Sequence, residues 1–245
     1  MSETNVKLQR ILLPLDVSRD SLAALQTALD LAAALNGEVS GLFVEDMRLV
    51  SAAGLPFARE IGSRSGISRN IGSEDIEHRF RAVAGKARAA LSESAGRQNV
   101  RSSFRTRRGD IATEILTASS EADLIVLGKA GWSGGTFHKA GDTCVSILTQ
   151  SRVPVLVVES GSQLSPPIVV ADDRTPGAQR AVETAKEISR SLKWKLVVLL
   201  LEPVKTGALV FQSVQSNRPR FFVLPASLRQ NDLLSQLRCP VLFVP

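Results

Sequence analysis

The sequence of 245 residues contains no tyrosine, and aromatic residues make up only 4% of it. Surfaces that bind nucleic acid gather basic residues on one face and often place aromatic side chains there to stack on bases. The basic residues here are scattered along the sequence, although the net charge is +6. We therefore interpret the positive charge as a solvated surface and expect no nucleic-acid partner.

Long apolar runs are also missing. The longest aliphatic run, Leu196 to Leu201, is far shorter than the roughly 20 residues that span a bilayer. The N-terminal stretch MSETNVKLQR has no apolar core of the kind found in signal peptides. These two features predict a cytoplasmic protein with no membrane partner.

Residues that bind metals or perform catalysis are scarce. The two cysteines, Cys144 and Cys239, have no metal-binding or redox spacing, so we expect two reduced thiols. The two histidines, His78 and His138, lack the Ser, Asp or Cys companions that a catalytic or metal site needs. The sequence therefore names no catalytic residue and no metal ligand, and it does not indicate an enzyme.

The most informative stretch of the sequence runs from Leu124 to Val158. An apolar run ends at Gly128, a glycine-rich loop follows, and a helical segment leads to a second apolar run that begins at Val153. Glycine lets backbone N–H groups approach a ligand closely, and a helix N-terminus attracts anions. This arrangement of strand, loop, helix and strand predicts an anion site, with phosphate as the natural ligand.

The spacing of the glycines distinguishes this loop from two common ones. It fits neither the Walker A pattern nor the dinucleotide pattern G-x-G-x-x-G. Two residues separate Gly128 from Gly131, and nine separate Gly131 from Gly141. This spacing resembles the nucleotide loop of the universal stress protein family, in which Ser or Thr follows the third glycine. Here Asp142 stands at that position.

Residues 1–160 alternate short apolar runs with amphipathic segments. We expect strands at 10–15, 39–44, 100–106, 124–127 and 153–158, with helices at 18–35, 73–91 and 110–120 and after residue 141. This order predicts an α/β fold, a doubly wound parallel five-stranded sheet with strand order 3-2-1-4-5. The crevice between its first and fourth strands would lie between Asp16 and Gly128. The segment from Met47 to Gly72 is predicted to be a long loop, with a helical turn near Pro56 to Ile61, that closes over the cleft as a lid.

The second part of the chain repeats the first. Residues 168–202 align without a gap with residues 11–45, at an offset of 168 − 11 = 157. The copy is truncated, and its stretch LPASLRQNDLL contains no glycine. We therefore predict a complete domain at 1–160, a linker at 161–167 and a truncated second domain at 168–245. The final strands, 153–158 and 241–244, should pair antiparallel as an intramolecular pseudo-dimer, and a further homodimer stays open.

The resemblance to the universal stress protein family implies both a fold and a ligand. Members adopt the Rossmann-like sheet described above, many bind ATP or AMP, and they commonly dimerise through their last strands. Transferred residue by residue, the resemblance implies a cofactor-binding set on this chain: Asp16, Val44, Leu127, Gly128, Gly131, Gly141, Asp142 and Thr143.

Several interpretations of this site remain open. Asp16 would contact the nucleoside, or it would only fix the turn before the first helix. Asp142 would repel a triphosphate, which favours AMP or an empty cleft, or it would bind ATP through Mg²⁺. The leading hypothesis is a stress-response regulator that binds adenine nucleotide and acts through an unknown protein partner. The alternatives are a relative that acts through protein contacts alone and, least favoured, a slow ATP hydrolase.

Overall fold

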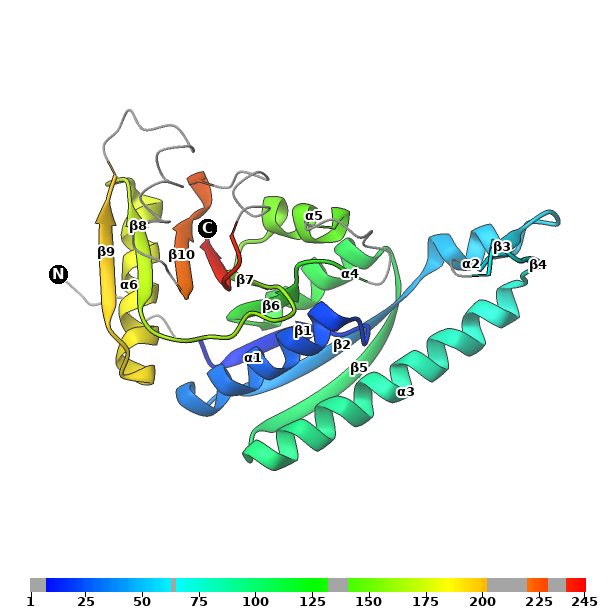
Figure 1. Ribbon diagram of the computed structural model, residues 1–245, viewed down its shortest axis with the longest axis horizontal. Helices are drawn as coiled ribbons and strands as arrows, with labels where there is room; N and C mark the ends of the chain where they lie inside the picture. Colours follow the sequence, from blue (N-terminus) through cyan, green and yellow to red (C-terminus); the bar gives the residue numbers. More distant parts are fainter. Residues whose placement is uncertain (1–7, 63–64, 132–140, 202–219, 229–236) are drawn as a thin grey trace.

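The computed structural model describes residues 8–62, 65–131, 141–201, 220–228 and 237–245. Its main feature is a nine-stranded sheet with the order β5-β2-β1-β6-β7-β11-β10-β8-β9, which runs through both halves of the chain (Figure 1). Both halves of the chain therefore share one continuous sheet.

The first half of the chain forms five parallel strands. They are β1 (Arg10–Pro14), β2 (Glu38–Asp46), β5 (Arg101–Gly109), β6 (Leu124–Gly128) and β7 (Val155–Val158). Their order is β5-β2-β1-β6-β7, which confirms the predicted order 3-2-1-4-5. β1 pairs with both β2 and β6, so the predicted crevice lies where the direction of winding reverses.

Helices cover both faces of this sheet, each over its own apolar core. On one face lie α1 (Arg19–Leu35) and α3 (Ser73–Gln98); on the other lie α4 (Ile111–Ala118), the short 3-10 helix η1 (Ser119–Glu121) and α5 (Asp142–Gln150). The predicted cap of α1 is confirmed, because the Ser18 side chain accepts a hydrogen bond from the Ser21 N–H. β2 and β5 extend further than predicted, since their carboxyl halves pair with each other along the edge of the sheet.

The second half adds four strands and one helix to the described chain. They are β8 (Ile168–Asp172), α6 (Pro176–Leu192), β9 (Leu196–Leu200), β10 (Phe221–Pro225) and β11 (Val241–Val244), with the 3-10 helix η2 (Ala226–Leu228) after β10. β11 pairs antiparallel with β7, with Leu242 opposite Leu156, which confirms the predicted contact between the two halves. The other strands of this half pair in parallel.

The backbone of the second half repeats that of the first at the offset of 157. Val17 and Arg174 both have positive φ, at 63° and 64°, and so do Asn36 and Lys193, at 51° and 56°. A non-glycine residue rarely adopts this conformation. The recurrence of two such positions, together with two helices of 17 residues each, is what a duplicated unit predicts.

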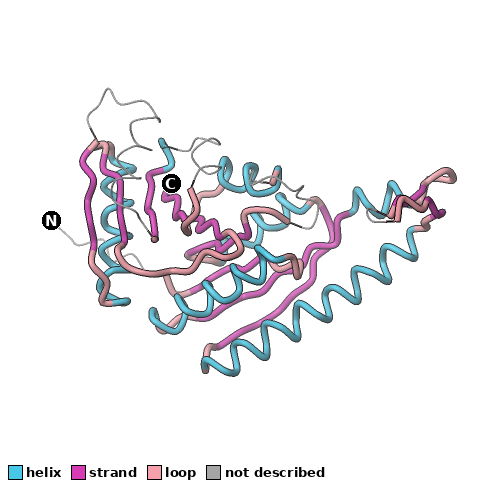
Figure 2. Tube along the Cα trace, viewed as in Figure 1, coloured by secondary structure: helices cyan, strands magenta, loops and turns pink. Residues whose placement is uncertain are grey.

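The segment from Met47 to Gly72 differs from the predicted loop. It forms α2 (Met47–Ala53) and a hairpin of β3 (Arg59–Ile61) and β4 (Ser68–Asn70), and together they make an arm. Of the helical turn predicted near Pro56 to Ile61, one hydrogen-bonded turn is present, from the Ala58 N–H to the Leu55 carbonyl at 3.0 Å, whereas Arg59–Ile61 form a strand. The arm projects beyond the sheet at the N-terminal end of α3 (Figure 2). Its closure over the cleft as a lid stays a prediction.

Ion pairs fasten the arm to α3. The Glu60 carboxylate lies 2.6 Å from Arg79 Nη1 and 2.7 Å from Arg69 Nη2. Hydrogen bonds from Arg79 and Arg69 lower the pKa of Glu60 to about 2. Outside this cluster the arm exposes large apolar side chains, of which Phe57 is 78% exposed.

Candidate functional site

Asp16 follows β1 at the carboxyl end of the sheet, where the sequence places it. Its Oδ1 accepts a hydrogen bond of 3.0 Å from the Ser18 N–H, which fixes the turn into α1. Val17 lies inside this turn at φ 63°. The carboxylate is therefore oriented by the backbone around it, and its other oxygen, Oδ2, faces the glycine loop.

The glycines at the end of β6 lie close to this turn for two different reasons. A Cβ at Gly128 would come within 2.8 Å of the backbone of Asp20 and Ser21, so glycine is needed there for β6 to pack against α1. A Cβ at Gly131 would lie 3.1 Å from Asp16 Oδ2. Gly131 thus keeps the Asp16 carboxylate beside the backbone of the loop.

The third glycine closes the base of the loop. The Gly141 N–H donates a hydrogen bond of 3.0 Å to the carbonyl of Lys129, and Gly141 is the N-cap residue of α5. No side chain caps this helix, so its first-turn N–H groups receive no side-chain acceptor among the described residues. The structure therefore brings Asp16, Gly131 and Gly141 together; residues 132–140 lie outside the described chain.

Asp142 and Thr143 occupy the first turn of α5. Asp142 is exposed and Thr143 is half-buried. Asp142 is a first-turn acid of α5, whose N-cap is Gly141. Its charge lies at the positive end of the helix dipole, at the position where an anion would bind.

Val44 and Leu127 can face the crevice only with their main-chain groups. β1 pairs with β2 only as far as Leu42, whose carbonyl accepts from the Leu15 N–H at 2.9 Å. Because peptide groups alternate along a strand, the Val44 N–H and C=O point to the same side as those of Leu42, beyond the last residue of β1. The Leu127 side chain is buried against α5 in the core, so only its main chain can face the cleft.

A polar network that the sequence did not reveal supports this loop. Asp20, in the first turn of α1, accepts hydrogen bonds of 2.9 Å from the N–H groups of Ala130 and Ser160. The Lys129 ammonium is buried and lies 3.0 Å from Glu159 Oε2, and Arg238 Nη1 lies 3.1 Å from Glu159 Oε1. The sequence signal that could have indicated this network is that a charged residue directly follows each of the buried strands β6 and β7.

The cysteines are free thiols, as predicted. Burial raises the pKa of Cys144 to about 12 and that of Cys239 to about 12, although the nearby Lys129 ammonium opposes the shift in both. A thiol with so high a pKa is neutral at physiological pH and therefore a poor nucleophile.

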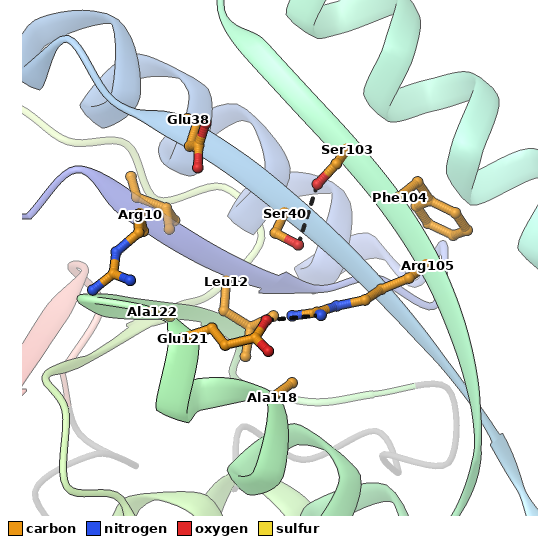
Figure 3. Close-up of a pocket in the computed structure, with 11 residues that line it drawn as sticks. Arg10, Leu12, Glu38, Ser40, Ser103, Phe104, Arg105, Ala118, Glu121 and Ala122 are labelled. Atoms are coloured by element: carbon orange, nitrogen blue, oxygen red, sulfur yellow. Dashed lines mark hydrogen bonds and ion pairs between the residues drawn. The ribbon is translucent and has the colours of Figure 1, made fainter.

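A separate cavity of about 270 Å³ lies at the opposite, amino edge of β1 and β2 (Figure 3). None of the predicted site residues lines it. Three of its charged side chains form ion pairs, since Arg105 Nη1 lies 3.0 Å from Glu121 Oε2 and Arg10 Nη2 lies 2.6 Å from Asp123 Oδ1. The ion pair of Arg105 places charge on β5, which is the edge strand of the sheet.

Within the described ranges, no cluster of three acidic, cysteine or histidine side chains could hold a metal ion. None of the described helices combines the length and the apolar character of a bilayer-spanning segment. The described strands and helices define a doubly wound α/β protein with Gly128, Gly131 and Gly141 near its switch point.

Comparison with known families agrees with this class. The sequence profile of the universal stress protein family matches residues 7–159, so the chain belongs to that family. No curated protein sequence matches the chain.

Solved structures share the fold. A universal stress protein from Archaeoglobus fulgidus DSM 4304 has a TM-score of 0.71 at 16% identity, covering 96% of this chain and 97% of that one. PA1789 from Pseudomonas aeruginosa PAO1, described as functionally unknown, has a TM-score of 0.62 at 12% identity, covering 97% and 92%. Universal stress protein UspA from Lactobacillus plantarum has a TM-score of 0.50 at 20% identity and covers 63% of this chain and 99% of its own. At these identities the likeness concerns the fold.

Proposed function

We propose that this universal stress protein binds an adenine nucleotide at the crevice of its first half, and that it prefers AMP to ATP. The domain limits 1–160 and 168–245 belong to the same proposal, with the second domain carrying no nucleotide. The observation that carries the proposal is the contact between Asp16 and Gly131, because a carboxylate that accepts hydrogen bonds lies next to a loop suited to phosphate.

The parts of the crevice suit the parts of a nucleotide. Asp16 Oδ2 is an acceptor for ribose hydroxyls, and the Val44 main chain offers one donor and one acceptor to a base edge. The backbone at Gly131 and Gly141 and the first turn of α5 offer N–H groups to a phosphate. Each of these groups lies at the end of a strand or at the start of a helix, which fixes its position.

Asp142 sets the preference for AMP. Two unit charges about 4 Å apart repel by about 4 kcal/mol at an effective dielectric of about 20. A triphosphate brings more negative charge to the start of α5 than a monophosphate does. Mg²⁺ between Asp142 and the phosphates would reverse this effect for ATP, so binding of ATP would then depend on the metal.

A pair of matched variants tests the proposal. Asp16 and Asp173 occupy equivalent turns, and each accepts a hydrogen bond from the N–H two residues later, but Asp173 belongs to the half whose sequence lacks the glycine loop. Asp16→Ala should weaken AMP binding in titration calorimetry by at least tenfold, and Asp173→Ala should leave it unchanged. Mass spectrometry of nucleotide released from the wild-type protein identifies the natural ligand.

Two results would contradict the proposal. If the wild type binds neither AMP nor ATP, with or without Mg²⁺, the relative that acts through protein contacts alone is the better description. Equal effects of Asp16→Ala and Asp173→Ala would show that Asp16 only fixes its turn.

A further inference from the structure

The Arg238 side chain connects the truncated second half to the base of the glycine loop. Arg238 lies shortly before β11, the strand that joins the two halves, and its Nη1 is 3.1 Å from Glu159 Oε1. Glu159 follows β7 directly and belongs to the first half. The second half thus places a cation on a residue that also contacts the loop.

The other oxygen of Glu159 holds Lys129. Lys129 Nζ lies 3.0 Å from Glu159 Oε2, and the Lys129 side chain is only 4% exposed. A buried ammonium needs a charged partner, so the position of Lys129 depends on that of Glu159. Arg238 and Lys129 therefore share one carboxylate between them.

Lys129 in turn fixes both ends of the glycine loop. Its N–H donates to the Val158 carbonyl at 2.8 Å, and its own carbonyl accepts from the Gly141 N–H at 3.0 Å. Gly141 is the N-cap of α5. A shift of Lys129 would therefore move the start of α5, where the phosphate of a nucleotide would bind.

We infer that the second half acts as a built-in support for the nucleotide site of the first half, through the chain of contacts Arg238, Glu159, Lys129 and Gly141. Arg238 is a positioning residue, because it orients the loop through Glu159 and Lys129 without contacting the nucleotide. The second half thus sets nucleotide affinity without a glycine loop of its own. The part of this inference that concerns affinity rests on the proposed nucleotide site; the part that concerns loop geometry does not.

The test uses the full chain and two variants of the second half. Arg238→Gln removes the guanidinium that contacts Glu159. Arg190→Gln is the matched control, because it removes an exposed arginine that pairs with Glu187 within α6 and forms no ion pair with the described residues of the loop. Circular dichroism spectra and thermal melts establish that both variants are folded.

The first measurement needs no nucleotide. Hydrogen exchange of peptides that contain Ala130 and the first turn of α5 should be at least about fivefold faster in Arg238→Gln than in the wild type, and unchanged in Arg190→Gln. Lys129→Met should also speed exchange at these amides, and adding Arg238→Gln to it should have little further effect, since both changes break one chain of contacts. Unchanged exchange in Arg238→Gln, or fully additive effects in the double variant, would overturn the inference.

The second measurement is the affinity for AMP by titration calorimetry. Arg238→Gln should weaken binding about tenfold and Arg190→Gln should not. If the wild type binds no AMP, the proposed function fails while the exchange experiment still decides the loop support. If the wild type binds AMP and Arg238→Gln binds it equally well, the inferred control of affinity is wrong while the proposed function stands.

Discussion

Gly128 lies directly against Ser21, because a Cβ at position 128 would come 2.8 Å from the Ser21 backbone nitrogen. The backbone of α1 cannot move aside to make room for this Cβ, whereas the end of a flexible side chain could. The loop therefore begins at a position where the strand and the helix are in van der Waals contact.

This contact predicts the effect of adding one methyl group. Gly128→Ala should lower the free energy of unfolding by about 1–3 kcal/mol, the usual cost of overpacking. Gly85→Ala is the control, since Gly85 lies in α3 with nothing within 4 Å of the added atom. Gly85→Ala should stabilise the protein by about 0.5–1 kcal/mol through its helix propensity. Urea denaturation measures both, and equal changes would contradict the packing argument.

The charge at the start of α5 predicts a gain of affinity on neutralisation. Asp142→Ser should raise affinity for ATP by at least about tenfold, or 1.4 kcal/mol, and raise affinity for AMP less. Calorimetry with and without Mg²⁺ separates repulsion from metal binding. Tight binding of ATP by the wild type without metal would refute the repulsion.

The buried Lys129–Glu159 pair predicts that a single variant loses more unfolding free energy than the double variant. Glu159→Gln leaves a buried ammonium without its carboxylate and should cost about 3–5 kcal/mol of unfolding free energy. Lys129→Met added to Glu159→Gln should recover part of this loss, because no buried charge then remains at position 129. Chemical denaturation of the wild type and the two variants tests this, and a double variant less stable than Glu159→Gln would show that the pair is not the cause.

The stability of the arm should depend on pH through the ionisation of Glu60. The pKa of Glu60 in the folded protein is lowered from 4.5 to about 2. The stability that its ion pairs give to the arm is therefore complete above about pH 4.5 and is lost as the pH falls toward 2. Hydrogen exchange in β3 and β4 should therefore be insensitive to pH above 4.5, after correction for the intrinsic rate, and should rise below it. Glu60→Gln should show the faster exchange already at neutral pH. Protection that stays constant from pH 6 to pH 2 would show that the Glu60 carboxylate does not hold the arm against α3.

The contact of β7 with β11 predicts the behaviour of the isolated first half. Residues 1–160 expressed alone would expose the apolar edge of β7, which should pair with a second copy or aggregate. Sedimentation should therefore detect a homodimer or insoluble material, while the full chain keeps that edge covered. A stable monomer of residues 1–160 would contradict this expectation.

The strand order was predictable because helical patterns separate the strands. β1, β2, β6 and β7 contain short apolar runs, whereas β5 is basic and alternating. Asp16 and Gly128 were predictable as neighbours from the general rule that ligands bind at the carboxyl ends beside a switch point. The arm was not predictable in this way, since Phe57 and Ile61 are exposed and leave no periodic pattern. Its fastener, Glu60 with Arg79, joins residues 19 positions apart in different elements.

The support of the glycine loop was missed for a related reason. Asp20 and Ala130 are 110 positions apart, and Glu159 and Arg238 are 79 apart. Single charged residues at strand ends resemble ordinary surface residues in a sequence. The packing of α1 against β6 makes the first pair neighbours, and the pairing of β7 with β11 brings the second pair together. Burial of Lys129 follows from that packing and has no local sequence pattern.

The antiparallel pairing of β7 with β11 also fixes how the protein responds to dilution. Two separate subunits joined by such a contact would part as their concentration fell, and their stability would rise and fall with expression level. Here the two strands belong to one covalent chain, so the contact forms at a constant effective concentration. Synthesis of more or fewer copies in the cell therefore leaves the geometry around Glu159 unchanged.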